Sequence, residues 1–188
     1  MTFSVDKSVE VLERTPGVLN VWLGGLSDFW VLSNYGEATF SPFDVVGHLI
    51  EAEQTNWMTR LRVILDRGEA EPFPPFDRYA MLETNTGKSM ADLLTAFTAL
   101  RVKSLDELKA LNLTPEALDR RGAHPAFGPV TARQLIAAWV VHDLGHLHQV
   151  AKAMAFQYRD DVGPSGSNPR PPYSRPSCSP SCRCRTHQ

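Results

Sequence analysis

The sequence predicts an all-α protein folded as a four-helix bundle. Apolar residues recur at helical spacing in four long segments, three of these segments begin with strong capping signals, and strand-like alternation is scarce. The connection over residues 67–88 is long enough to run back along the bundle, so it favours a crossover that leaves the second and third helices parallel. The bundle is expected to occupy residues 1–162.

The first helix is predicted in two pieces. One face of the first piece is apolar, through Val5, Val9 and Leu12. A new start is expected at Thr15-Pro16, because threonine is a good N-cap and proline suits the first helical position. This piece should continue to about Leu23 and end at Gly24-Gly25, with a loop over residues 26–40.

The second helix has a clear start signal. Ser41 provides a cap, Pro42 fits the first helical position, and Asp44 completes a capping pattern. The helical pattern continues to about Asp66, and Gly68 follows as a stop.

The third and fourth helices begin at similar capping patterns, at residues 89–92 and 131–134. The third helix turns a row of apolar residues inward, namely Leu93, Leu94, Phe97, Leu100, Leu105 and Leu108. A short helical turn is expected at residues 114–116 and a loop at 124–129. The last helix should reach about Tyr158.

Three histidines lie on apolar helical faces. His142 and His146 are one turn apart, an arrangement used by helical metal sites. They share a face with Leu135, Trp139, Gln149 and Val150. His48 lies on the second helix in line with Val45, Ala52 and Thr55. Imidazoles from two neighbouring helices can hold a divalent metal and leave it open positions, as in catalytic sites.

Other interpretations of these residues stay open. Buried histidines can simply be hydrogen-bonded core residues. A dinuclear carboxylate site would use Glu51 or Asp143, but the expected last helix contains no glutamate to complete a di-iron pattern. Glu51 is therefore expected at a polar rim and Glu53 in solvent, while His148 lies on another face and is excluded as a ligand.

The composition changes abruptly at residue 163. Residues 163–188 hold six prolines, six serines, four arginines and no acidic residue, which predicts a disordered tail. Such a change within one chain is also consistent with frameshifted or non-native sequence. The tail offers an alternative metal-binding cluster, Cys178, Cys182, Cys184 and His187, although the spacing fits no standard zinc module.

Charge and hydropathy exclude several classes of protein. The formal net charge of −2 argues against nucleic acid as a partner. No segment is apolar for long enough to span a membrane, and the N-terminal residues lack the apolar block of a signal peptide. A cytoplasmic protein without membrane contact is the expectation.

Two segments, GHLIEAE and HDLGHLHQ, carry a resemblance to the DinB/YfiT-like superfamily of metal-dependent enzymes. The resemblance covers roughly residues 5–164 and ends at Gly163-Pro164. It implies up-down-down-up topology and a divalent metal held by His48, His142 and His146. Nickel or zinc is the metal implied most strongly, with iron or manganese also compatible. Superfamily members include hydrolases, thiol S-transferases and mycothiol-dependent isomerases, and many are homodimers, so the resemblance implies a homodimer here.

The expected function is therefore a metal-dependent enzyme that activates water or a low-molecular-weight thiol against a small-molecule substrate. Glu51 or Asp143 could accept a proton or orient an imidazole. Arg60, Arg78 and Tyr79 could bind an anionic or sugar-like thiol, or could simply be solvated surface. The alternative expectation is a non-catalytic bundle that binds a metal or a small ligand in a stress response.

Overall fold

The computed structural model of the chain describes residues 3–163. All of the predicted tail except Gly163 lies outside the described residues, and so does the alternative cluster of Cys178, Cys182, Cys184 and His187. The described residues divide between two units, residues 3–157 and residues 158–163. In the described part of the second unit, the backbone N–H groups of Asp161 and Val162 donate to the carbonyl of Tyr158.

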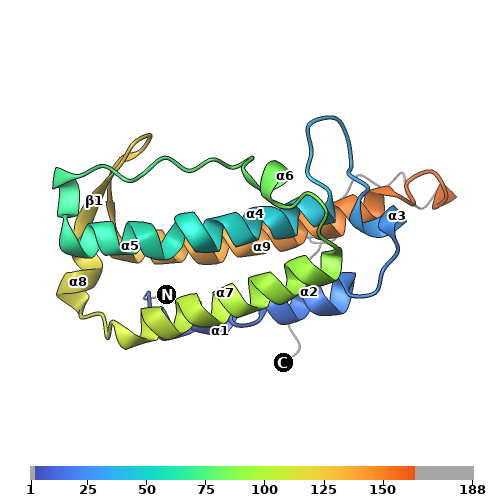
Figure 1. The fold of residues 1–188 in the computed structure, drawn as a ribbon. Coiled ribbons are helices and arrows are strands. Elements are labelled where there is room, and N and C mark those ends of the chain that lie inside the picture. The colour runs from blue at the N-terminus through green and yellow to red at the C-terminus, as the bar shows by residue number, and fades with distance from the viewer. Residues whose placement is uncertain (1–2, 164–188) are drawn as a thin grey trace, which may run out of the picture. The chain divides into compact units, whose positions relative to one another are not determined.

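Four helical segments form the bundle of the first unit: α1 (Val5–Leu12) with α2 (Thr15–Leu23), α4 (Pro42–Thr55) with α5 (Trp57–Asp66), α7 (Met90–Ala110), and α9 (Ala132–Phe156). Figure 1 shows that α4–α5 and α7 run in the same direction, whereas α1–α2 and α9 run in the opposite one. The connection between α5 and α7 returns along the bundle to make this possible. The predicted four-helix bundle with up-down-down-up topology is confirmed.

The predicted capping signals account for three of the helix starts. The hydroxyl of Ser41 accepts from the backbone N–H of Asp44 at 3.2 Å, and the Asp44 carboxylate accepts from the Ser41 N–H at 2.9 Å. The same reciprocal pattern starts α7 at residues 89–92 and α9 at residues 131–134. Each capping box satisfies two of the backbone donors that a helix start leaves free.

The predicted loops contain more structure than the sequence indicated. Short helices form within them: α3 (Asp28–Val31), η1 (Gly68–Ala70) and α6 (Met81–Thr84), while α8 (Pro115–Asp119) matches the expected turn. The loop predicted at 124–129 is shorter in the structure, residues 125–127, because β1 (Arg121–His124) and β2 (Gly128–Thr131) form an antiparallel hairpin that was not predicted, in which His124 pairs with Gly128. The two strands, RGAH and GPVT, are short and do not alternate apolar with polar residues, so they give no strand signal in the sequence. The second helix is also interrupted, at Asn56.

The core consists of two clusters of buried side chains stacked along the bundle. One cluster includes Leu135, Ile136 and Trp139 of α9, and the other includes Val150 of the same helix. Residues 142–146 lie between these two sets on α9. No helix of the described residues is long and apolar enough to cross a membrane.

Candidate metal centre

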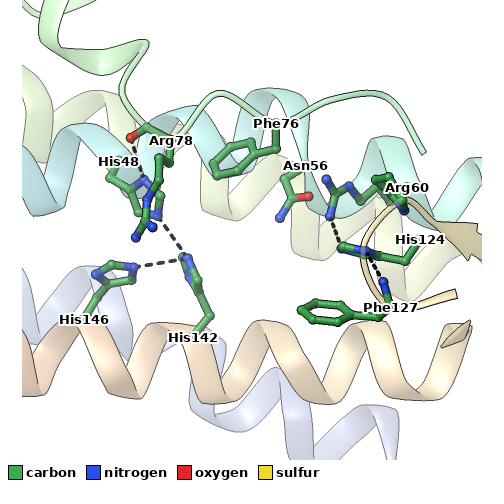
Figure 2. A pocket seen from close by; sticks show the side chains of 10 residues that line it. His48, Asn56, Arg60, Phe76, Arg78, His124, Phe127, His142 and His146 are labelled. Carbon is green, nitrogen blue, oxygen red and sulfur yellow. Dashed lines mark hydrogen bonds between the residues drawn. The ribbon is translucent and has the colours of Figure 1, made fainter. Parts of the chain in front are cut away.

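The three predicted histidines meet between α4 and α9 (Figure 2). Nε2 of His142 lies 3.1 Å from Nε2 of His48 and 3.1 Å from Nε2 of His146. One potential ligand atom from each ring lies within 4.8 Å of the other two. His48 is buried, with 3% of its surface exposed, and the other two rings are half-buried.

The tautomer of two of the rings is fixed by hydrogen bonds at the outer nitrogen, Nδ1, which is the ring nitrogen not directed at the other histidines. Nδ1 of His48 lies 3.3 Å from the carbonyl oxygen of Arg78, and Nδ1 of His146 lies 3.0 Å from Oε1 of Gln149. Both oxygens can only accept, so each Nδ1 carries the proton and each Nε2 presents a lone pair. A proton on His142 Nε2 could satisfy only one of these two lone pairs at a time.

Burial keeps these rings neutral. Burial, together with the charge that His142 would carry, lowers the pKa of His48 to about 4. The same two causes, with His48 added, lower the pKa of His146 to about 3. Neutral imidazole is the form that binds metals.

The donor set fits a divalent transition metal. Two nitrogen ligands at the usual zinc–nitrogen distance of about 2.0–2.1 Å in tetrahedral geometry lie roughly 3.3 Å apart, close to the 3.1 Å measured between the ring nitrogens. Three nitrogens without a thiolate suit zinc, nickel, iron or copper, and leave positions open.

A glycine beside His48 allows its outer hydrogen bond to form. A Cβ atom at Gly47 would lie 2.1 Å from Nδ2 of Asn85 and 3.2 Å from Cγ of Met81, so α6 packs closely against α4 only because residue 47 has no side chain. The connection that leads into α6 carries Arg78, whose carbonyl faces His48. The crossover therefore positions one of the three rings.

Asp143, the residue next to His142, belongs to a buried ion network together with Arg101 and Glu53. Arg101 of α7 donates from Nη1 to Asp143 at 2.6 Å, from Nε to Glu53 at 2.9 Å, and from Nη1 to the carbonyl of Leu12 at 2.8 Å. The side chains of Arg101, Glu53 and Asp143 are at most 1% exposed. The network thus ties together all four sides of the bundle.

The expectation that Glu53 is solvated is wrong, because it faces Arg101 in the core. Burial raises the pKa of Glu53 despite the opposing charge of Arg101. Burial also favours the neutral form of Asp143, but contact with His142 and the ion pair with Arg101 outweigh it and hold the pKa of Asp143 below its usual value. Asp143 lies 4.0 Å from Nδ1 of His142, so it can orient that ring once the two atoms approach.

The remaining predicted residues separate into two groups. Arg60 is buried and lines the cavity described below. Arg78 and Tyr79 are exposed; Arg78 also lines the cavity, whereas Tyr79 does not. Glu51 is outside the three-histidine cluster, and its carboxylate accepts from the hydroxyl of Thr55. His148 is exposed, as expected for a residue on another face of the helix.

A cavity of about 520 Å³ opens onto the three histidines, a size typical of small-molecule sites. It is lined by His48, Asn56, Arg60, Phe76, Arg78, His124, Pro125, Phe127, His142 and His146. The sequence analysis missed Asn56, His124 and Phe127. The last two depend on the hairpin, which the sequence did not reveal.

Residues 12–150 match the model of the DinB superfamily. The chain belongs to the DinB superfamily. Among solved structures, this DinB protein is similar to YfiT from Bacillus subtilis, described as "a probable metal-dependent hydrolase with an unusual four-helix bundle topology". The two share 20% identity, with a TM-score of 0.66 over 84% of this chain and 87% of YfiT, which shows a common fold. No curated protein matches the sequence.

Proposed function

We propose that this protein is a metal-dependent hydrolase of small molecules in which His48, His142 and His146 hold a divalent cation, nickel or zinc. The convergence of the three Nε2 atoms supports this most directly, because Nε2 of both His48 and His146 presents a lone pair toward Nε2 of His142. The DinB fold and the description of YfiT agree with this proposal.

When bound, the cation supplies Lewis acidity, which lowers the pKa of water or of a thiol toward neutrality and so provides a nucleophile. The protein's own residues prepare the site for it. The Arg78 carbonyl and the Gln149 side chain hold the outer nitrogens of two rings. The ring centroids of Phe76 and His48 are 5.5 Å apart, and those of Trp57 and His142 are 5.0 Å apart, so aromatic rings pack against two of the three histidines.

A low-molecular-weight thiol is the second nucleophile that the proposal admits, which would make the reaction an S-transfer.

One observation favours a different candidate, a bundle that binds a metal or small ligand without turnover. The described lining of the cavity includes no carboxylate, and the nearby Asp143 is engaged by Arg101. No acidic side chain of this lining can therefore act as a general base.

Turnover assays on the full chain test the proposal. The purified protein is incubated with aryl esters and amides, with and without a small thiol, before and after EDTA treatment. We expect hydrolysis that EDTA abolishes, that added nickel or zinc restores, and that His142→Ala lacks. The matched control is His148→Ala, an exposed histidine on the same helix. Product that forms only when the thiol is present would establish thiol transfer. Bound metal without any turnover would support the non-catalytic binding bundle. Turnover that EDTA does not affect would refute the proposal.

A further inference from the structure

The cavity contains a buried arginine that has no acidic partner among residues 3–163. Arg60 is 8% exposed and forms none of the ion pairs found in this part of the chain. Its Nη2 donates to the carbonyl of Pro74 at 3.4 Å, its guanidinium lies 5.3 Å from the centre of the Phe73 ring, and its Nε has no hydrogen-bond partner there. A buried charge without a counter-charge is costly, so this arrangement points to an anion that binds.

His124 provides a second donor at the same place. Its Nδ1 accepts the backbone N–H groups of Ala126 at 3.1 Å and Phe127 at 3.3 Å, so the proton of the neutral ring lies on Nε2. That Nε2 is 3.3 Å from Nη1 of Arg60. An arginine cannot accept a hydrogen bond. Two donors therefore face each other, and an anionic oxygen beside them would accept from both.

The rest of the cavity connects these donors to the three histidines. Figure 2 shows His48, His142 and His146 at one end, Arg60 and His124 at the other, and Phe76 and Asn56 between them. Asn56 is buried, and its Oδ1 has no partner among the described residues. Phe127 is 78% exposed and stacks on His124 at 4.5 Å, so it provides an apolar surface at the entrance.

The two ends are far enough apart to define the shape of the ligand. Arg60 lies twelve positions after His48 along α4 and α5, which corresponds to roughly 18 Å between their backbones at about 1.5 Å per residue, the short interruption at Asn56 aside. The side chain of Arg60 points back toward Asn56 and shortens this span (Figure 2). A ligand that contacts both ends must be elongated.

We propose that Arg60 and His124 form an oxyanion subsite that binds the carboxylate of an elongated substrate. The apolar body of the substrate lies along Phe76 and Phe127, and its reacting group reaches the three histidines. The identity of this ligand as a substrate depends on the proposed function, but binding of its anionic end does not require the metal.

Calorimetric titration of the full chain, as purified and after EDTA treatment, tests the subsite. The probes are phenylpropanoate, its neutral amide phenylpropanamide, and phenyl phosphate, all at neutral pH. We expect the carboxylate to bind more tightly than the amide in both preparations. Arg60→Gln should weaken carboxylate binding about ten- to hundredfold, the usual value of a hydrogen bond to a charged group. Binding of the amide should not change, and Arg60→Lys should recover part of the loss.

The matched control is Arg62→Gln on the same helix, because Arg62 is exposed and paired with Glu107. Equal binding of the carboxylate and the amide would overturn the inference, as would a carboxylate preference that Arg60→Gln leaves intact. Tighter binding of phenyl phosphate than of phenylpropanoate would overturn the assignment of a carboxylate and show that the subsite prefers a phosphate ester.

A second measurement keeps the test decisive if Arg60→Gln fails to fold. In the unaltered chain, phenylpropanoate should shift the NMR signals of the His124 ring, and phenylpropanamide should not. The metal content of Arg60→Gln should equal that of the unaltered chain. If the unaltered chain binds the carboxylate but no metal, the proposed hydrolase is refuted and the subsite is supported. If it binds metal but shows no preference for the carboxylate, the subsite is refuted and the proposed hydrolase is unaffected.

Discussion

Replacing Arg101 by methionine should strongly destabilise the bundle. Arg101 is 1% exposed and donates to Asp143, Glu53 and the carbonyl of Leu12. Methionine fills much of the same volume but leaves two carboxylates buried without a positive partner. Removing one member of a buried ion pair costs about 3–5 kcal/mol. For a domain of this size, that loss corresponds to a fall in Tm of about 6–20 °C.

Urea unfolding, followed by circular dichroism, measures this loss of stability. Arg62→Met is the matched control, because its partner Glu107 is at the surface and exposed ion pairs contribute only about 0–1 kcal/mol. Without Arg101, burial should raise the pKa of both Glu53 and Asp143 above their unfolded values. The folded variant then takes up protons, so its deficit should shrink as the pH falls from 7 toward about 4. A deficit no larger than that of the control, or one that grows on acidification, would refute this reasoning.

Two further predictions concern the histidine cluster. Gly47→Ala should displace Asn85 and weaken the hydrogen bond that holds His48, which lowers metal affinity several-fold and stability by about 1–3 kcal/mol. Metal titration and urea unfolding measure both effects, and an affinity equal to that of the unaltered chain would contradict the role given to the crossover. The control is Gly145→Ala, because a Cβ there meets no atom within 4 Å and alanine should stabilise the helix by about 0.5–1 kcal/mol. In the metal-free chain, the ring signals of His48 and His146 should titrate near pH 4 and pH 3 in NMR spectra. Since unfolded histidines take up protons near pH 6.5, the metal-free protein should lose stability as the pH falls from about 6.5 toward 4; titration of both rings near pH 6.5 would contradict this.

The helical framework could be predicted because its signals are local. Capping pairs such as Ser41 with Asp44 depend on residues three apart, and apolar periodicity depends on residues within a few turns. The position of His48 opposite His142 also followed, since each lies on an apolar face that a bundle turns inward. The crossover followed from the length of the connection alone.

The buried ion network was missed because charge alone does not reveal burial. Glu53 looked like a solvated residue on an amphipathic helix, yet it faces Arg101. A signal was present, since Arg101 is spaced four residues from both Phe97 and Leu105 and so interrupts the inward apolar row of its helix. A charged residue in such a row predicts a buried partner on another helix.

The far end of the cavity could not be predicted for a different reason. His124 and Phe127 reach it through a hairpin of two four-residue strands, and Arg60 reaches it through tertiary packing. None of these relations is encoded in short-range spacing. Gly122 is an example. A Cβ atom at this position would lie 2.6 Å from the Phe73 ring, so two segments far apart in the sequence pack closely in the structure.

Elemental analysis of the purified full chain tests the central claim most directly. The three-histidine arrangement predicts a stoichiometric divalent transition metal, lost in His48→Ala, His142→Ala and His146→Ala and retained in His148→Ala. Metal far below stoichiometric amounts after reconstitution, or metal that stays bound in His142→Ala, would contradict the claim that these three rings form the site.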